Sequence, residues 1–180
     1  MHRAVPGQRA AHTPRASTGA ADVTVYDLPE GHYEVTGARF AIVAARFNHA
    51  VVDRLLAGAL AAFARHGVQA RSLEVVRVPG AFELPLAAMA VGRRDDITAV
   101  VTLGCVIRGG TPHFEYVCAE SARGVGAAAL ALDKPVIFGV LTTDDRAQAE
   151  ARAGGAHGNK GEEAALAALE MVSVLRALGS

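Results

Sequence analysis

The sequence predicts one α/β domain built on a four-stranded parallel sheet with helices on both faces. Apolar runs of six to eight residues alternate along the chain with longer segments in which apolar residues recur at helical spacing. This alternation is typical of βαβ units. The chain has 180 residues, of which 51% are hydrophobic and 20% charged, so one domain with a substantial core is expected and wholesale disorder is excluded.

Four continuous apolar runs are the predicted strands. Each is bounded by polar, glycine or proline residues, as expected for strands buried on both faces of a parallel sheet. The predicted strands span residues 40–45, 73–78, 97–104 and 135–142.

The segments that follow these strands are the predicted helices. Gly67 stands where a glycine commonly ends a helix, and Pro112 stands where a proline commonly starts one. The predicted helices span residues 51–63, 82–93, 113–131, 145–152 and 160–178.

The N-terminal part of the chain is predicted to lie outside the folded domain. We expect a flexible extension over residues 1–36, with a short edge strand near residues 22–26, and a domain over residues 37–180. Residues 1–21 carry no acidic residue and no apolar segment of the kind that a secretory signal needs. Their Arg-rich composition leaves an organellar transit peptide as the alternative to a disordered extension.

Charge and composition exclude several classes of protein. Lys and Arg number 18 and Asp and Glu number 18, and this balance argues against nucleic-acid binding. No apolar stretch reaches the roughly 18 residues of a membrane span. Cys105 and Cys118 lack CxxC spacing and the histidines lack ligand spacing, so we expect no disulfide framework, no metal and a cytoplasmic location. A net charge near zero favours self-association.

Candidate functional residues lie in the loops after the strands, where ligands of open α/β sheets bind. Phe47 follows the first strand, and its ring could stack on a planar heterocycle or cover the core. Glu83 follows the second strand at the start of a helix. Its carboxylate could complement the helix dipole or accept hydrogen bonds from ligand hydroxyls.

The loop after the third strand is the strongest candidate. Gly110 and Thr111 precede a helix whose free N–H groups suit an anion. His113 lies in the first turn of that helix, where the positive end of the dipole favours a neutral imidazole that can accept a proton. Arg152 and Lys160 lie near the start of the last helix, a position that disfavours cations unless an anion is close.

Taken together, these loops resemble the lumazine synthase family, which catalyses the penultimate step of riboflavin biosynthesis. The resemblance extends over residues 37–178. The matching segments, in the family's order and spacing, are RFN at 46–48, VPGAFELP at 78–85, LGCVIRGGTPHFEYV at 103–117, PVIFGVLTT at 135–143, and QAEARAG and NKGEEAA within 148–165.

The resemblance implies a flavodoxin-like three-layer α/β/α sandwich and a defined reaction. In that reaction 5-amino-6-(D-ribitylamino)uracil condenses with 3,4-dihydroxy-2-butanone 4-phosphate to 6,7-dimethyl-8-ribityllumazine, and phosphate and water are released. Neither a metal nor an organic cofactor is implied.

The resemblance also implies roles for individual residues. His113 would transfer protons, Phe47 would stack on the uracil, and Glu83 would accept hydrogen bonds from the ribityl hydroxyls. In the same subunit, Ala81 and Phe82 would lie beside the ribityl chain, the main chain of Cys105, Val106 and Ile107 at the pyrimidine edge, and Gly110 and Thr111 at the phosphate. The adjacent subunit would contribute three residues. Phe138 would cover the heterocycle, Arg152 would bind the phosphate, and Lys160 would contact the pyrimidine side.

The resemblance implies a homo-oligomer whose size stays open. Members of the family form pentamers, decamers or sixty-subunit shells, and a shell can enclose riboflavin synthase. The turn from Gly154 to Lys160 has the short form typical of shell-forming members, although Ala156 stands where those members commonly have Lys. We expect an assembly built of pentamers, with the shell favoured.

The same fold could also serve other functions. The main alternative is a non-catalytic flavin or lumazine carrier, or a structural shell protein, which would be expected to lack His113 or Arg152. An enzyme that dismutates two lumazines would need no phosphate site. A generic nucleotide-binding protein would leave the pairing of His113 with Arg152 unexplained.

Overall fold

The sheet has four parallel strands in the order β2-β1-β3-β4. They are β1 (Phe40–Ala45), β2 (Leu73–Val78), β3 (Ala99–Ile107) and β4 (Val136–Thr143). The computed structural model describes residues 31 and 33–179. Most of the predicted extension, including the edge strand near residues 22–26, lies outside these residues. The predicted α/β class and the four-stranded parallel sheet are confirmed.

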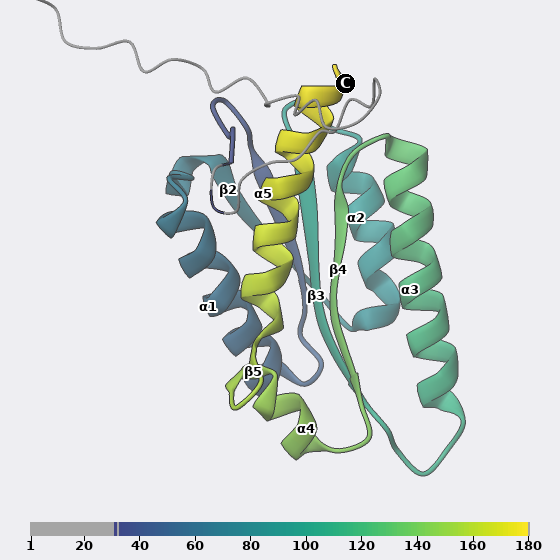
Figure 1. Ribbon diagram of the computed structural model, residues 1–180. Helices are drawn as coiled ribbons and strands as arrows, with labels where there is room; N and C mark the ends of the chain where they lie inside the picture. Colours follow the sequence, from purple (N-terminus) through teal and green to yellow (C-terminus); the bar gives the residue numbers. More distant parts are fainter. Residues whose placement is uncertain (1–30, 32, 180) are drawn as a thin grey trace, which may run out of the picture.

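Helices cover both faces of this sheet. In Figure 1, α1 (His49–Arg65) and α5 (Lys160–Leu178) lie on one side, and α2 (Leu84–Gly92) and α3 (His113–Leu132) lie on the other. The buried apolar side chains accordingly form two clusters, one on each face of the sheet. The result is the three-layer α/β/α sandwich that the resemblance implies. None of the described helices is long and apolar enough to cross a membrane.

The end of β3 differs from the prediction. The apolar run suggested a strand over residues 97–104 and a loop from Cys105, whereas β3 continues to Ile107. Cys105 and Ile107 extend the ladder because they pair with Leu141 and Thr143 of β4. The prediction that residues 105–107 lie in a loop is therefore wrong, although they still reach the carboxyl edge of the sheet.

A small hairpin between α4 (Arg146–Ala151) and α5 was not predicted. Its strands are β5 (Ala153–Gly155) and β6 (Gly158–Asn159), which pair antiparallel. Two short 3-10 helices, η1 (Ala70–Ser72) and η2 (Ala81–Glu83), precede β2 and α2. Strands of two or three residues with several glycines have no apolar periodicity that would mark them in the sequence.

The backbone of α5 lies against both α1 and β4, and two glycines allow this contact. A Cβ on Gly161 would lie 2.0 Å from the carbonyl oxygen of Leu55 in α1. A Cβ on Gly139 in β4 would lie 2.7 Å from the carbonyl oxygen of Thr102 and 3.0 Å from the Cβ of Ala164. No larger residue fits at either place without movement of the backbone.

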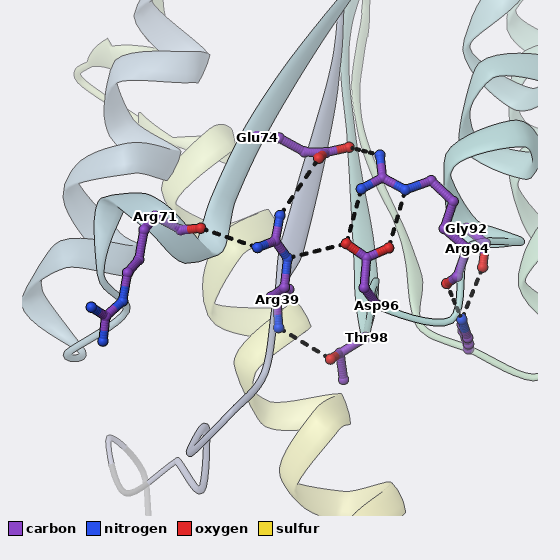
Figure 2. A network of polar contacts seen from close by, with 8 residues as sticks. Arg39, Arg71, Glu74, Gly92, Arg94, Asp96 and Thr98 are labelled. Atoms are coloured by element: carbon purple, nitrogen blue, oxygen red, sulfur yellow. Dashed lines mark hydrogen bonds and ion pairs between the residues drawn. The ribbon is translucent and has the colours of Figure 1, made fainter.

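A charged network joins the amino-terminal ends of the strands (Figure 2). Arg39, directly before β1, lies 3.9 Å from a carboxylate oxygen of Glu74 in β2 and 3.3 Å from one of Asp96. Arg94 contacts both carboxylates, at 2.7 Å for Glu74 and 3.0 Å for Asp96. Hydrogen bonds from Arg94 lower the pKa of Asp96. The network connects β1 and β2 with the turn that leads into β3.

We expect Asp96→Asn to lower the thermal unfolding temperature at neutral pH, because it removes the carboxylate that Arg39 and Arg94 share. A carboxyl group whose pKa is lowered by folding stabilises the native state above its unfolded pKa, and this stabilisation disappears as the pH falls through the folded pKa. The deficit of the variant should therefore shrink below about pH 4. Thermal unfolding followed by circular dichroism between pH 2 and 7 measures this deficit in unfolding temperature.

Asp95→Asn is the matched control. It removes the same charge from the neighbouring exposed residue, for which the described part of the chain provides no ion pair. A deficit in Asp96→Asn that does not change with pH, or an equal deficit in Asp95→Asn, would contradict the role assigned to the network.

Candidate active site

The carboxyl ends of β1, β2 and β3 border a cleft of about 610 Å³. Its walls come from the loop after β1, the turn after β2, the end of β3 with the following loop, and the start of α3. Of the predicted site residues, Phe47, Ala81, Phe82, Glu83, Cys105, Val106, Ile107, Thr111 and His113 line it, together with Pro79, Gly80, Gly109, Phe114 and Val117.

Hydrogen bonds hold the loop after β1 against both neighbouring strands. Asn48 has a left-handed backbone (φ 57°), and its side-chain amide donates to the carbonyl oxygen of Cys105 at 2.9 Å. The N–H of Phe47 donates to the carbonyl oxygen of Pro79 at 2.9 Å. The Phe47 side chain remains 70% exposed. This ring therefore does not cover the core, and it is free to stack on a planar ligand.

The turn after β2 is closed by Glu83. Its Oε2 accepts a hydrogen bond of 2.9 Å from the N–H of Gly80. Ala81 is buried below the turn, whereas the Phe82 side chain is 56% exposed at the cleft. The carboxylate of Glu83 thus stabilises its own turn, and Glu83 is also a lining residue of the cleft.

The loop between β3 and α3 contains two glycines that the fold itself does not require. A Cβ on Gly109 or Gly110 would meet no heavy atom within 4 Å, and neither residue has a positive φ. Space is therefore left beside this loop. Gly110 lies in the loop without lining the cleft, whereas Thr111 lines it. His113 is the first residue of α3, as predicted, and its side chain is exposed.

Arg108 ties this loop to its surroundings, and the sequence reasoning did not single it out. Its Nε donates to Asp144 at 2.9 Å, its guanidinium also pairs with Glu115, and its Cζ lies 4.2 Å above the centre of the Phe114 ring. Hydrogen bonds with Asp144 and Glu115 raise the pKa of Arg108, and the bond from Arg108 lowers the pKa of Glu115. These contacts join the loop to the start of α3 and to the end of β4.

The Cys105 thiol is not activated as a nucleophile. Burial raises its pKa to about 11, so the thiol stays protonated at neutral pH. Its carbonyl oxygen already accepts the hydrogen bond from Asn48. At this position the main chain, and not the sulfur, is the group that a ligand would meet.

Phe138, Arg152 and Lys160, the residues expected from an adjacent subunit, line a second hollow of about 370 Å³. Residues 137–143 of β4 form one wall, and Phe138 there is 41% exposed. Arg152, Lys160 and Glu163 form the other. The N–H of Lys160 donates to the carbonyl oxygen of Arg152 at 2.9 Å, and the Lys160 ammonium pairs with Glu163. The Arg152 guanidinium donates to the carbonyl oxygen of Gln148 at 3.0 Å.

The two hollows are separate within one chain. They share no lining residue, and the first is bounded by α3 whereas the second is bounded by α5 on the opposite face of the sheet. One chain therefore does not bring Phe138, Arg152 and Lys160 to His113. Among residues 31 and 33–179, no three His, Cys, Asp or Glu side chains gather as a metal site would require.

Comparison with known proteins gives matches over most of the chain. A family described as 6,7-dimethyl-8-ribityllumazine synthase matches residues 37–176. The 6,7-dimethyl-8-ribityllumazine synthase of Aquifex aeolicus (strain VF5) is 50% identical over 149 residues, which are 83% of this chain and 97% of that protein.

We expect Arg108→Met to increase amide hydrogen exchange in residues 109–113 and to change the thermal unfolding temperature little. Methionine can still pack on Phe114 but pairs with neither Asp144 nor Glu115. Exposed ion pairs without a bidentate contact, unlike the Arg94–Asp96 pair, contribute little to global stability. Hydrogen exchange followed by mass spectrometry measures the effect. Arg123→Met, which breaks the exposed pair with Glu120 on α3, is the control. Equal exchange of this loop in both variants would show that Arg108 does not hold it.

Proposed function

The chain belongs to the 6,7-dimethyl-8-ribityllumazine synthase family, and we propose that it condenses 5-amino-6-(D-ribitylamino)uracil with 3,4-dihydroxy-2-butanone 4-phosphate to the lumazine, with release of phosphate and water. As a member of this family it is a transferase of riboflavin biosynthesis. One observation carries the proposal of substrates. The matching segments at 46–48, 78–85 and 103–117 meet around a single cleft at the carboxyl edge of the sheet.

The pyrimidine substrate fits the apolar part of this cleft. The exposed ring of Phe47 stacks on the uracil, and the main chain of residues 105–107 meets the polar edge of the base. Stacking on an aromatic ring positions a planar heterocycle without a charge. Glu83 and the adjacent Ala81 and Phe82 border the ribityl chain, whose hydroxyls donate to the carboxylate.

The phosphorylated substrate is assigned to the loop between β3 and α3. Gly110 and Thr111 offer backbone N–H groups at the start of a 20-residue helix, where an anion is stabilised. The space left beside Gly109 and Gly110 is of the kind that a phosphate close to the backbone needs. Arg152 of the adjacent subunit supplies the charge-assisted hydrogen bonds.

The reaction begins when the amine of the pyrimidine adds to the ketone and water leaves to form an imine. Loss of a proton from the hydroxyl-bearing carbon and of phosphate from the next carbon then gives an enol, which tautomerises to a new carbonyl. The ring closes as the ribityl-bearing nitrogen attacks this new carbonyl and water leaves. His113 transfers protons in these steps, which contributes about 10²- to 10⁴-fold in rate. Holding both substrates together contributes up to roughly 7–11 kcal/mol. His113 therefore assists the reaction without being indispensable.

The complete site is proposed to lie between two copies of the chain. Phe138, Arg152 and Lys160 of one copy close the cleft that His113 and Phe47 of the next copy border. The separation of the two hollows on opposite layers of the fold supports this arrangement. A homo-oligomer built of pentamers, extending to a sixty-subunit shell, would supply such neighbours.

The function is tested by an optical assay in which the purified protein is mixed with both substrates. We expect lumazine absorbance and fluorescence to grow above the uncatalysed rate in proportion to enzyme. Arg152→Ala should mainly raise the KM for the phosphorylated substrate, because it removes the charge that binds phosphate. An unchanged KM would refute that assignment. If the folded oligomer gives no rate above background, the result would favour the non-catalytic flavin or lumazine carrier. Such a carrier should purify yellow.

A mixed assembly tests the shared site. We expect His113→Ala to retain measurable activity and Arg152→Ala to be impaired at low substrate concentration. Oligomers assembled from both variants together contain some interfaces at which both wild-type residues meet, so their activity should exceed the average of the two parents. Activity equal to that average, in oligomers shown by mass spectrometry to contain both chains, would place the site within one chain.

A further inference from the structure

The side chain of Asn159 joins three elements, β6, α1 and α5, of which α5 borders the second hollow. Its Nδ2 donates to the carbonyl oxygen of Arg54 in α1 at 2.9 Å. Its Oδ1 accepts hydrogen bonds from the N–H groups of Gly161 and Glu162 in the first turn of α5, at 2.9 and 3.2 Å. One amide therefore fastens the hairpin strand β6 to α1 and caps α5.

Gly58 in α1 leaves the space that this amide occupies. A Cβ on Gly58 would lie 2.4 Å from both the Cγ and the Nδ2 of Asn159 and 2.5 Å from its Oδ1. Gly58 lies in the middle of α1 and has no positive φ, so the helix itself does not require glycine. Glycine weakens a helix interior relative to alanine. Its use here is explained by the contact with Asn159.

The backbone around Asn159 carries both cations of the second hollow. Lys160 follows it directly, and the N–H of Lys160 donates to the carbonyl oxygen of Arg152 at 2.9 Å. Asn159 also pairs with Ala153, the residue after Arg152. A movement of Asn159 relative to α1 therefore moves the backbone of Arg152 and Lys160 together.

We propose that Asn159, seated against Gly58, is a positioning residue that sets where Arg152 and Lys160 meet the phosphorylated substrate of the adjacent subunit. It touches neither substrate and acts through the two cations. This inference rests on the proposed function, in which Arg152 binds phosphate.

The test compares Gly58→Ala and Asn159→Ala with the wild-type oligomer. Gly58→Ala removes no polar group, and the atoms that it meets are the end of one side chain, so we expect it to fold with the Asn159 amide displaced. Both variants should raise the KM for the phosphorylated substrate, and the inhibition constant of inorganic phosphate, on the order of tenfold, because a small misplacement of a binding group is costly. Thermal unfolding and light scattering establish that each variant is folded and assembled.

Gly126→Ala is the matched control. It is the same substitution in a helix, at a position where a Cβ would meet no atom within 4 Å, and it should leave both constants unchanged. Stability provides a second readout. In an Asn159→Ala background the clash is gone, so adding Gly58→Ala should cause no further loss of stability. If Gly58→Ala lowers the stability of the Asn159→Ala variant as much as it lowers that of the wild type, residue 58 does not contact the Asn159 side chain.

Combination with Arg152→Ala separates the two proposals. If Asn159 acts through Arg152, adding Gly58→Ala to Arg152→Ala raises the KM for the phosphorylated substrate much less than it does in the wild type. If Arg152→Ala raises that KM but Gly58→Ala and Asn159→Ala, both folded, leave it unchanged, the positioning role alone is overturned. If Arg152→Ala itself leaves it unchanged, the phosphate assignment fails and the positioning role falls with it.

Discussion

All four strands of the sheet run parallel, and most of the architecture follows from that constraint. Parallel neighbours need a crossover of a dozen or more residues, and the crossovers here contain α1, α2 and α3. These helices cover both faces, which is why every residue of β1 is buried. Because the strands point the same way, the loops after β1, β2 and β3 meet at one edge, and there they border the larger cleft.

The two edges of the sheet use polar groups in different ways. At the amino edge, arginines and carboxylates around Arg39 and Asp96 pair with one another and join the strand ends. At the carboxyl edge, the contacts of Asn48 and Arg108 hold loops in place, whereas exposed aromatic rings, His113 and Gly109 are left facing the cleft. One edge stabilises the fold, and the other presents groups to a ligand.

The two halves of the candidate site lie on opposite faces of the sheet, one bordered by α3 and the other by α5. Gly161 and Gly139 allow α5 to lie on the backbone of α1 and β4, and the hairpin before α5 is held to α1 through Asn159. Arg152 and Lys160 are therefore fixed on the layer opposite to α3 and His113. A rigid separation of this kind makes a neighbouring copy, rather than a movement within the chain, the source of the missing half in the proposed mechanism.

Local patterns in the sequence are sufficient to predict the type and order of the main helices and strands. The apolar runs at 40–45 and 73–78 are β1 and β2 at the predicted bounds, and Gly67 and His113 lie where the helix signals placed them. Periodicity and glycine or proline signals depend on neighbouring residues only. Such local signals could not predict the extension of β3 to Ile107, the hairpin after α4, the contacts of Arg108 and Asn159, or the separation of the two hollows. Each arises from pairing or packing between segments far apart in the sequence, and such contacts exist only once the layers have assembled.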